Sequence, residues 1–314
     1  MVETVLGTFM EQELLSQPDI WTRAIDQSRS EDLLPADGLA VAVIGCGTSW
    51  FMAQSYAVMR ERLGKGLTDA FAASEAFLNH NSAPRTYDAV VVITRSGTTS
   101  EVLEVVAGLR GKVPTVALIG DLESPLVGLA DTVIGLPYAD ERSVVQTRFA
   151  TAALAYLLTN LGVDLTEAVA DARDAVSTEV PHELLDAEQF TFLGSGWTVG
   201  LAHEAGLKMR EAVQGWTESY SAMEYRHGPI SIAAPGRVVW LLGDEPAGLE
   251  ADVAETGALY IHGGQHPLAQ LARVHKVTLE RARARGLNPD VPRNLSRSVI
   301  LAATATATAT ASAG

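Results

Sequence analysis

The chain has 314 residues, of which 47% are hydrophobic, and a formal net charge of −15. The length predicts about two domains. The acidic balance argues against nucleic-acid and anionic-membrane partners, because these need a basic protein face. The single cysteine, Cys46, cannot form an intramolecular disulfide. Neither a signal-peptide pattern nor an apolar run of membrane-spanning length is present. We therefore expect a cytoplasmic protein.

Strands and helices alternate along the first half of the chain, after an amphipathic N-terminal segment in which Gln17–Trp21 is expected to pack a helix onto the first domain. Continuous apolar runs predict strands, and the segments between them read as helices. The expected strands are 39–45, 88–94, 114–119 and 132–136, and the expected helices are 49–63, 100–111 and 150–161. Short apolar strands that alternate with helices predict a parallel sheet with both faces covered.

The same alternation of strands and helices begins again after an acidic helical segment. Further strands are expected at 190–195, 237–243 and 258–262, and a helix at 197–214. A strand, a glycine loop and a helix occur in that order near both residue 45 and residue 194, which indicates an internal duplication. The expected organisation is a helical segment (1–30), a first α/β domain (31–162), a helical linker (163–188), a second α/β domain (189–300) and a low-complexity tail (301–314).

Two loops are candidates for holding a phosphate. GCGTS (45–49) and TRSGTTSE (94–101) each lie between an expected strand and an expected helix. Glycines allow the backbone to approach a ligand, and hydroxyls and helix N-termini donate to phosphate oxygens. Turns and helix caps use the same residue types. Ligands of open α/β sheets bind at the carboxyl ends of strands, however, and both loops lie there.

Glu204, Lys208 and Glu211 share one face of an expected helix, at positions i, i+4 and i+7. The alternative interpretation is a solvated ion-pair stripe, but the small neighbours of these residues favour close packing. His227 follows a loop rich in tyrosine and serine. A lysine, a carboxylate and a histidine are together able to move a proton next to a carbonyl. His262 and His266 have no evident third ligand, so no metal site is expected.

The chain resembles the sugar isomerase (SIS) double-domain proteins, most closely the isomerase half of glucosamine-6-phosphate synthase. The resemblance covers nearly the whole chain. Its motifs are GCGTS (45–49), RSGTTSEV (95–102), QTR (146–148), GSGWTVGLAHEAGLKMRE (194–211), ESYSAMEYRHGPI (218–230) and PRNLSRSV (292–299). It implies an α/β fold of two tandem flavodoxin-like three-layer sandwiches with parallel sheets. It also implies a sugar-phosphate substrate, no cofactor and a homodimer.

The resemblance also implies roles for individual residues. Glu211 matches the base that moves a proton between C1 and C2 of the sugar. His227 matches a ring-opening histidine that can reach the partner subunit's site, and Lys208 matches a polar residue of the sugar site. The remaining matches to substrate or phosphate contacts are Gly47, Thr48, Ser49, Thr94, Arg95, Ser96, Thr98, Thr99, Gln146, Glu204 and Arg297.

Three departures from the synthase pattern shape the expected activity. No glutamine-hydrolysing domain is evident, so synthesis fed by glutamine is not expected. The RSGTTSEV loop is similar to that of stand-alone amino-sugar-phosphate deaminases. Arg297 occupies the position of the synthase's C-terminal lysine, and arginine cannot form a Schiff base.

Three functions follow as alternatives. The first is isomerisation or deamination of a hexosamine 6-phosphate such as glucosamine 6-phosphate. The second is a dehydratase, or lyase, that eliminates water from N-acetylglucosamine 6-phosphate after the same C2 deprotonation. The third is a non-catalytic phosphosugar-binding regulator.

Overall fold

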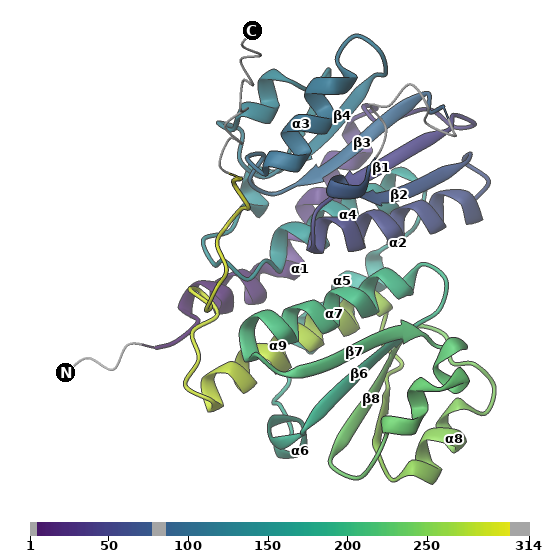
Figure 1. Cartoon of the computed structure of the whole chain (residues 1–314), viewed down its shortest axis with the longest axis vertical. Coiled ribbons are helices and arrows are strands. Elements are labelled where there is room, and N and C mark those ends of the chain that lie inside the picture. The colour runs from purple at the N-terminus through teal and green to yellow at the C-terminus, as the bar shows by residue number, and fades with distance from the viewer. Residues whose placement is uncertain (1–4, 77–85, 302–314) are drawn as a thin grey trace, which may run out of the picture.

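Two parallel sheets form the framework of the computed structural model, which describes residues 5–76 and 86–301 (Figure 1). The first sheet has the strand order β2-β1-β3-β4-β5 and the second β7-β6-β8-β9. The strands of the first sheet are β1 (Val41–Gly45), β2 (Thr68–Ala72), β3 (Ala89–Thr94), β4 (Thr115–Ile119) and β5 (Thr132–Gly135). Those of the second are β6 (Gln189–Gly194), β7 (Trp216–Ser221), β8 (Arg237–Leu242) and β9 (Leu259–His262). The predicted α/β fold with parallel sheets is confirmed.

The two units repeat one pattern, as the glycine loops suggested. In each sheet the first strand is flanked by the second and third strands of its unit, all parallel. Gly45 and Gly194 end the corresponding strands β1 and β6. A Cβ on Gly45 would lie 2.7 Å from the backbone carbon of Ser49, and one on Gly194 2.3 Å from the carbonyl oxygen of Thr198. In both units only glycine lets the following helix pack this close to the strand end.

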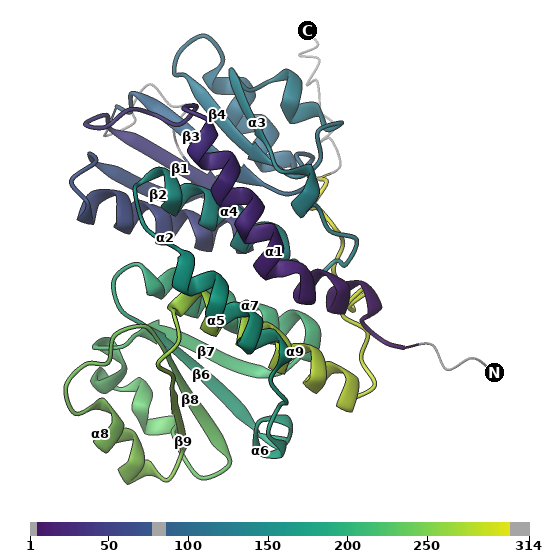
Figure 2. The ribbon, with the colours of Figure 1, turned by 180° about the vertical axis from the view of Figure 1, so that it is seen from behind.

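Helices fill the space between the sheets and cover their outer faces (Figures 1 and 2). The helices are α1 (Thr8–Ser30), α2 (Thr48–Arg62), α3 (Ser100–Leu109), α4 (Arg148–Asn160), α5 (Thr166–Ser177), α6 (His182–Asp186), α7 (Thr198–Val213), α8 (Leu249–Thr256) and α9 (Pro267–Ala284). The main hydrophobic core contains residues of both sheets and of the helices between them, whereas α3 and α8 pack in smaller clusters on the outer faces. None of the described helices is long and apolar enough to cross a membrane.

The N-terminal helix α1 packs onto the first unit, as Gln17–Trp21 predicted (Figure 2). Trp21 is fully buried, and its indole nitrogen donates to the Thr151 hydroxyl of α4 at 2.9 Å. Gln17 accepts from the same hydroxyl at 3.1 Å. A buried polar pair inside an apolar interface fixes the position of α1 on α4, since leaving either group unpaired would cost about 1–3 kcal/mol.

A close contact between α2 and α7 joins the two units. A Cβ added to Gly200 of α7 would lie 2.3 Å from the backbone oxygen of Phe51 on α2. The absence of a side chain at residue 200 therefore lets the two helix backbones approach. This contact holds the polar face of α7, with Lys208 and Glu211, against the loops of the first unit.

Several elements differ from the sequence prediction. Residues 216–221, expected as part of a loop, form the edge strand β7, while β2, α8 and α9 were not predicted. The N-terminal segment is one helix from Thr8 to Ser30 that includes Pro18. Residues 302–314 of the low-complexity tail lie outside the described residues, so its structure remains a prediction.

Candidate active site

A cavity of about 190 Å³ lies at the carboxyl ends of β1 and β3. These two strands are neighbours, and the chain continues from them toward opposite edges of the sheet. The cavity therefore lies at the topological switch point, where ligands of open α/β sheets bind. Its walls come from both glycine loops, the 144–146 loop, α7 and a C-terminal segment. The lining residues are Cys46, Gly47, Thr48, Ser49, Ile93, Thr94, Arg95, Ser96, Thr99, Val102, Val144, Gln146, Lys208, Glu211, Leu295, Ser296, Arg297, Ser298 and Val299.

The loop after β3 is shaped by its own hydroxyls. The Thr94 hydroxyl accepts from the Gly97 amide at 3.2 Å, and the Ser96 hydroxyl accepts from the Thr98 amide at 3.3 Å. Gly97 has φ +59°, and a Cβ there would lie 2.1 Å from the Ser124 hydroxyl oxygen. Only glycine fits this turn, which places Ser96 and Thr99 along the cavity wall beside the start of α3.

The structure brings together most of the site residues predicted from sequence. Eleven of the fourteen line the cavity: Gly47, Thr48, Ser49, Thr94, Arg95, Ser96, Thr99, Gln146, Lys208, Glu211 and Arg297. The Gln146 amide nitrogen is buried and has no hydrogen-bond partner within the described residues. A donor in that position is available to a bound ligand, because an unpaired buried donor otherwise costs free energy.

Three predicted site residues lie elsewhere. Thr98 does not line the cavity, and its hydroxyl donates to that of Ser298 at 3.0 Å. Glu204 is fully buried beneath Lys208. His227 ends the short 3₁₀ helix η5 (Glu224–His227) on the second unit, where it is exposed. A role for His227 in catalysis therefore requires that it reach the site of another copy.

The polar face of α7 is an internal charge cluster. The Lys208 ammonium is 2.5 Å from Glu211 Oε2 and 3.6 Å from Glu204 Oε1. The side chains of Lys208 and Glu204 are 1% and 0% exposed, whereas that of Glu211 is 20% exposed and lines the cavity. The alternative of a solvated stripe is therefore wrong.

Burial determines the protonation of this cluster. It raises the pKa of Glu204 to about 8, although the Lys208 ammonium opposes the shift. Burial alone would lower the pKa of Lys208, but Glu204 and Glu211 outweigh it, and the pKa of Lys208 is raised. At neutral pH, Glu204 therefore keeps its proton and Lys208 its positive charge. The Lys208 ammonium then pairs chiefly with the Glu211 carboxylate.

Behind Lys208, a buried histidine extends the polar cluster toward α1. His275 of α9 is fully buried, and its Nδ1 lies 3.3 Å from the Gln17 amide nitrogen. Burial lowers the pKa of His275 to about 3, and the Lys208 charge adds to this effect. The imidazole is therefore neutral at physiological pH. The nitrogen of Gln17 is a donor, which assigns the imidazole proton to Nε2.

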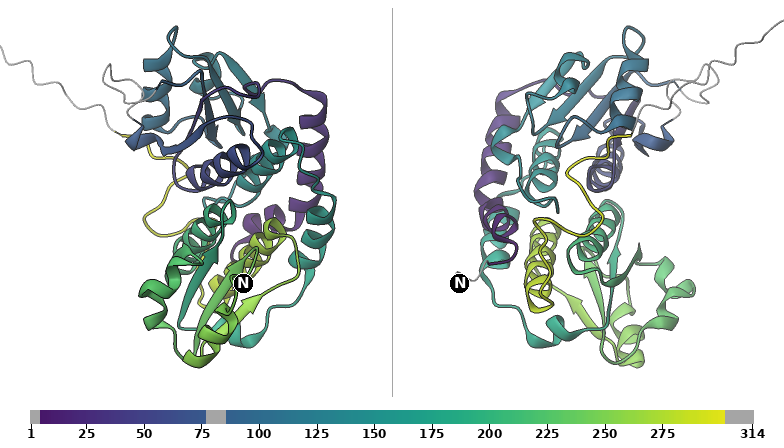
Figure 3. Two further views of the ribbon diagram at one scale, coloured as in Figure 1. Left: turned by 90° about the vertical axis from the view of Figure 1, so that its right-hand side faces the viewer. Right: turned by 60° about the vertical axis from the view of Figure 1, so that its left-hand side comes forward.

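The C-terminal segment 285–301 runs from the end of α9 along the first unit (Figure 3), and we call its part at the cavity, residues 295–299, the strap. It forms one wall of the cavity. The Val299 carbonyl accepts from the Ser100 amide at 3.2 Å, at the start of α3. Sequence reasoning singled out Arg297 in the strap but not Ser296 or Ser298, although all three belong to the same PRNLSRSV motif.

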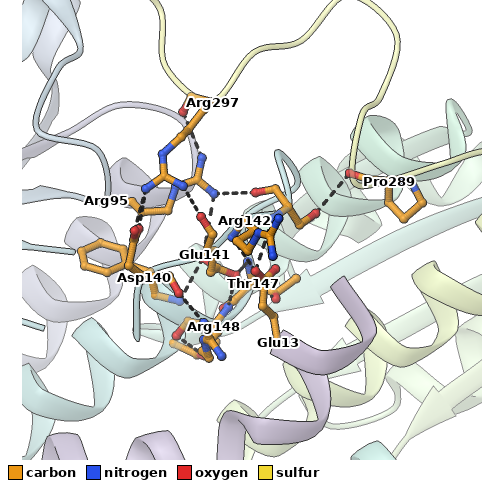
Figure 4. Close-up of polar contacts among 12 residues, drawn as sticks. Glu13, Arg95, Asp140, Glu141, Arg142, Thr147, Arg148, Pro289 and Arg297 are labelled. Carbon is orange, nitrogen blue, oxygen red and sulfur yellow. Dashed lines mark hydrogen bonds and ion pairs between the residues drawn. The ribbon is translucent and has the colours of Figure 1, made fainter. Parts of the chain in front are cut away.

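An arginine–carboxylate network joins the strap to the rest of the cavity wall (Figure 4). Arg297 Nη2 lies 2.6 and 2.8 Å from the two carboxylate oxygens of Asp140, and its Nη1 donates to the Glu141 carbonyl. The Arg95 guanidinium donates to the carbonyls of Ser143 at 3.0 Å and of Arg297 at 2.9 Å. The terminal nitrogens of Arg95 and Arg297 thus already have protein acceptors, whereas the buried Arg95 Nε has no hydrogen-bond partner among the described residues.

The same network reaches α1 through two buried carboxylates. Glu141 Oε1 accepts from the Thr147 and Arg148 amides, both at 2.7 Å, and Glu13 Oε1 accepts from the Arg142 amide at 2.5 Å. Burial raises the pKa of Glu13 to about 7, and the charge of Glu141 adds to the shift.

No group of three or more metal-ligating side chains occurs in the described ranges 5–76 and 86–301.

Comparison with known proteins agrees with this geometry. Residues 38–160 match the profile of the SIS domain. The chain is 25% identical over 322 residues to a glutamine–fructose-6-phosphate aminotransferase (isomerizing) of Sulfurisphaera tokodaii, an alignment that covers 91% of this chain and 53% of the relative. The chain thus spans about half the length of the curated relatives it matches.

Two solved structures share the fold. Glucosamine-6-phosphate deaminase from Thermotoga maritima superposes with a TM-score of 0.74 at 22% identity, covering 93% of this chain and 100% of that one. Tagatose-6-phosphate ketose/aldose isomerase from Escherichia coli gives 0.74 at 19% identity, covering 91% and 96%. Residues 38–160 therefore match the SIS domain, and the chain as a whole shares its fold of two parallel-sheet units with these solved structures.

Proposed function

We propose that the protein is an enzyme that deprotonates C2 of a hexosamine 6-phosphate and so isomerises or deaminates it without glutamine. The observation that carries the proposal is the cavity itself, which joins hydroxyl-rich loops at a switch point to the Glu211–Lys208 pair. The names of the relatives add support, because they mention fructose, glucosamine and tagatose 6-phosphates.

The substrate phosphate would bind to the hydroxyls and backbone amides of the two glycine loops, beside the starts of α2 and α3. Ser49, Ser96 and Thr99 line this part of the cavity. Neutral donors and helix N-termini hold a phosphate without a free cation. This fits a wall in which the guanidinium groups of Arg95 and Arg297 already have protein partners.

Glu211 is the base of the proposed reaction. Its carboxylate reaches the cavity and accepts a hydrogen bond from Lys208, whose ammonium is held in place by burial. As the C2 proton moves to Glu211, negative charge develops on the substrate oxygens. The Lys208 ammonium is then placed to stabilise that charge. Opening of the sugar ring is assigned to His227 of a second copy in a homodimer, because His227 is exposed and outside the cavity of its own chain.

Elimination is the second candidate, and one observation favours it. Among the described residues that line the cavity, Lys208 alone carries an amine, and that amine is paired with Glu211. A reaction through an imine on a free lysine therefore lacks its nucleophile. An N-acetylated substrate needs no imine, because loss of the 3-hydroxyl after C2 deprotonation leaves the C2 nitrogen untouched.

Product analysis by NMR in deuterated water separates these functions. The purified protein is incubated with glucosamine 6-phosphate and, separately, with N-acetylglucosamine 6-phosphate. We expect fructose 6-phosphate and ammonia from the free amine, with deuterium incorporated into the product. An unsaturated product from the acetylated sugar would establish the dehydratase instead. Binding without turnover of either sugar would contradict an enzymatic role and indicate a phosphosugar-binding regulator.

A further inference from the structure

We propose that Arg297 is a positioning residue: it holds the strap as a wall of the cavity through Asp140 and does not itself take part in the chemistry. This inference rests on the proposed function for its kinetic test, but its structural test does not. The position matters because Arg297 stands where the resembling synthase has a lysine, and because the side chain here has an identifiable protein partner.

The side-chain contacts of Arg297 are with protein acceptors, although the residue lines the cavity. One terminal nitrogen of its guanidinium, Nη2, contacts both carboxylate oxygens of Asp140 in a charge-assisted interaction. Its other terminal nitrogen donates to the Glu141 carbonyl. Three acceptor oxygens, all on the 140–141 segment, therefore take up the two terminal nitrogens (Figure 4).

The backbone of the same residue is held from the opposite side. The Arg297 carbonyl accepts from Arg95, which also binds the carbonyl of Ser143. Arg95 is 5% exposed and belongs to the loop 95–99 after β3, which we call the hydroxyl loop. Two arginines thus join the strap, the hydroxyl loop and the 140–143 segment, and residues of the strap and of the loop line the cavity.

The ion pair between Arg297 and Asp140 fixes the position of the two serines in the strap. Ser296 and Ser298 flank Arg297 and line the cavity. The Ser298 hydroxyl accepts from Thr98, which ties it to the hydroxyl loop. If the Arg297 side chain lost Asp140, the strap would keep the Ser298–Thr98 contact and the backbone contacts of Arg297 with Arg95 and of Val299 with Ser100, but not its ion pair. The strap hydroxyls would then be held less firmly at the cavity. The expected consequence is weaker substrate binding, with the proton-transfer step at Glu211 unaffected.

The kinetic test uses Asp140→Asn, Arg297→Ala and the charge swap Asp140→Arg/Arg297→Asp. Both partners are about one-third exposed, so we expect each single variant to raise KM about tenfold while kcat changes less than about twofold. The swap should recover most of the lost KM, because it restores the ion pair. A residue that reacts with substrate could not be rescued in this way.

Lys65→Ala serves as the matched control. Lys65 forms an ion pair with Asp37 at 2.6 Å, outside the cavity. Its substitution is therefore expected to leave KM unchanged. A kcat loss in Arg297→Ala that the swap does not rescue would place Arg297 in the chemistry and overturn the proposal.

Hydrogen–deuterium exchange of the peptide containing 295–301 tests the proposal without any substrate. We expect faster amide exchange there in Asp140→Asn and wild-type exchange in the swap. Unchanged exchange in Asp140→Asn would overturn the inference. If wild-type protein turns over no sugar phosphate but the strap exchanges as expected, the proposed function fails and the positioning role of Arg297 stands.

Discussion

Glu204 provides a direct test of the electrostatics of the site, through the substitution Glu204→Gln. The carboxyl group is fully buried, and neither of its oxygens has a hydrogen-bond partner of normal geometry among the described residues. Its pKa rises from 4.5 to about 8 on folding, with burial as the main cause. Glutamine has nearly the same shape as a protonated glutamate and cannot ionise. The variant therefore removes the titration and keeps the packing.

The sign of the effect follows from linkage. Between pH 4.5 and 8, the folded protein holds a proton on Glu204 that the unfolded chain releases. The contribution of Glu204 to the free energy of unfolding therefore falls as pH rises through this window, by about 1.4 kcal/mol per pH unit. The full shift corresponds to an upper limit of about 5 kcal/mol. Glu204→Gln lacks this dependence, so its stability relative to wild type should increase with pH up to about 8 and then level off.

Urea unfolding followed by tryptophan fluorescence at pH 5, 6, 7 and 8 measures this slope. The pH-independent loss of the contact with Lys208 shifts all points equally and does not affect the slope. Glu104→Gln on α3 is the control, because Glu104 is exposed and its substitution should give a flat difference. A flat difference for Glu204→Gln as well would refute the assignment of a protonated carboxyl group beneath Lys208.

Two further predictions concern the loop after β3 and the proposed contribution of His227 to the site of a second copy. Gly97→Ala forces a side chain into a left-handed turn against Ser124. We expect it to destabilise the protein by about 1–3 kcal/mol and to weaken inorganic phosphate binding in calorimetry; a variant with wild-type phosphate affinity would contradict the loop's role. Mixing inactive Glu211→Gln and His227→Ala subunits should restore roughly a quarter of wild-type activity if His227 completes its partner's site. No recovery after verified subunit exchange would place His227 outside the reaction.

The central strands could be predicted because burial leaves a local signal. The runs 41–45 and 89–93 carry no polar side chain, and every residue of the strands β1 and β3 is buried. The edge strands β2 and β7 read TDAFA and WTESYS and are mostly half-buried. They carry too few apolar residues to be recognised in a parallel sheet, and their positions depend on pairing with β1 and β6.

The candidate site likewise has one part that could be predicted from sequence and one part that could not. The hydroxyl-rich loops and the Glu204–Lys208–Glu211 face are local motifs, so they could be identified from the sequence alone. The Arg297–Asp140 pair joins residues 157 positions apart, and no periodicity connects them. The burial of Glu204 likewise depends on how α7 packs against α2 and α9. Sequence therefore predicted which residues gather at the cavity, but not which of them are already paired with one another.

Deuterium exchange at C2 of glucosamine 6-phosphate, followed by proton NMR, tests the central claim most directly. Wild-type protein, Glu211→Gln and the control Glu104→Gln are compared in deuterated water, with substrate affinity measured in parallel by calorimetry. We predict exchange at C2 with wild type and control, and at least a thousandfold slower exchange with Glu211→Gln, which should bind the sugar with similar affinity. Exchange at the wild-type rate in Glu211→Gln would contradict the assignment of Glu211 as the base.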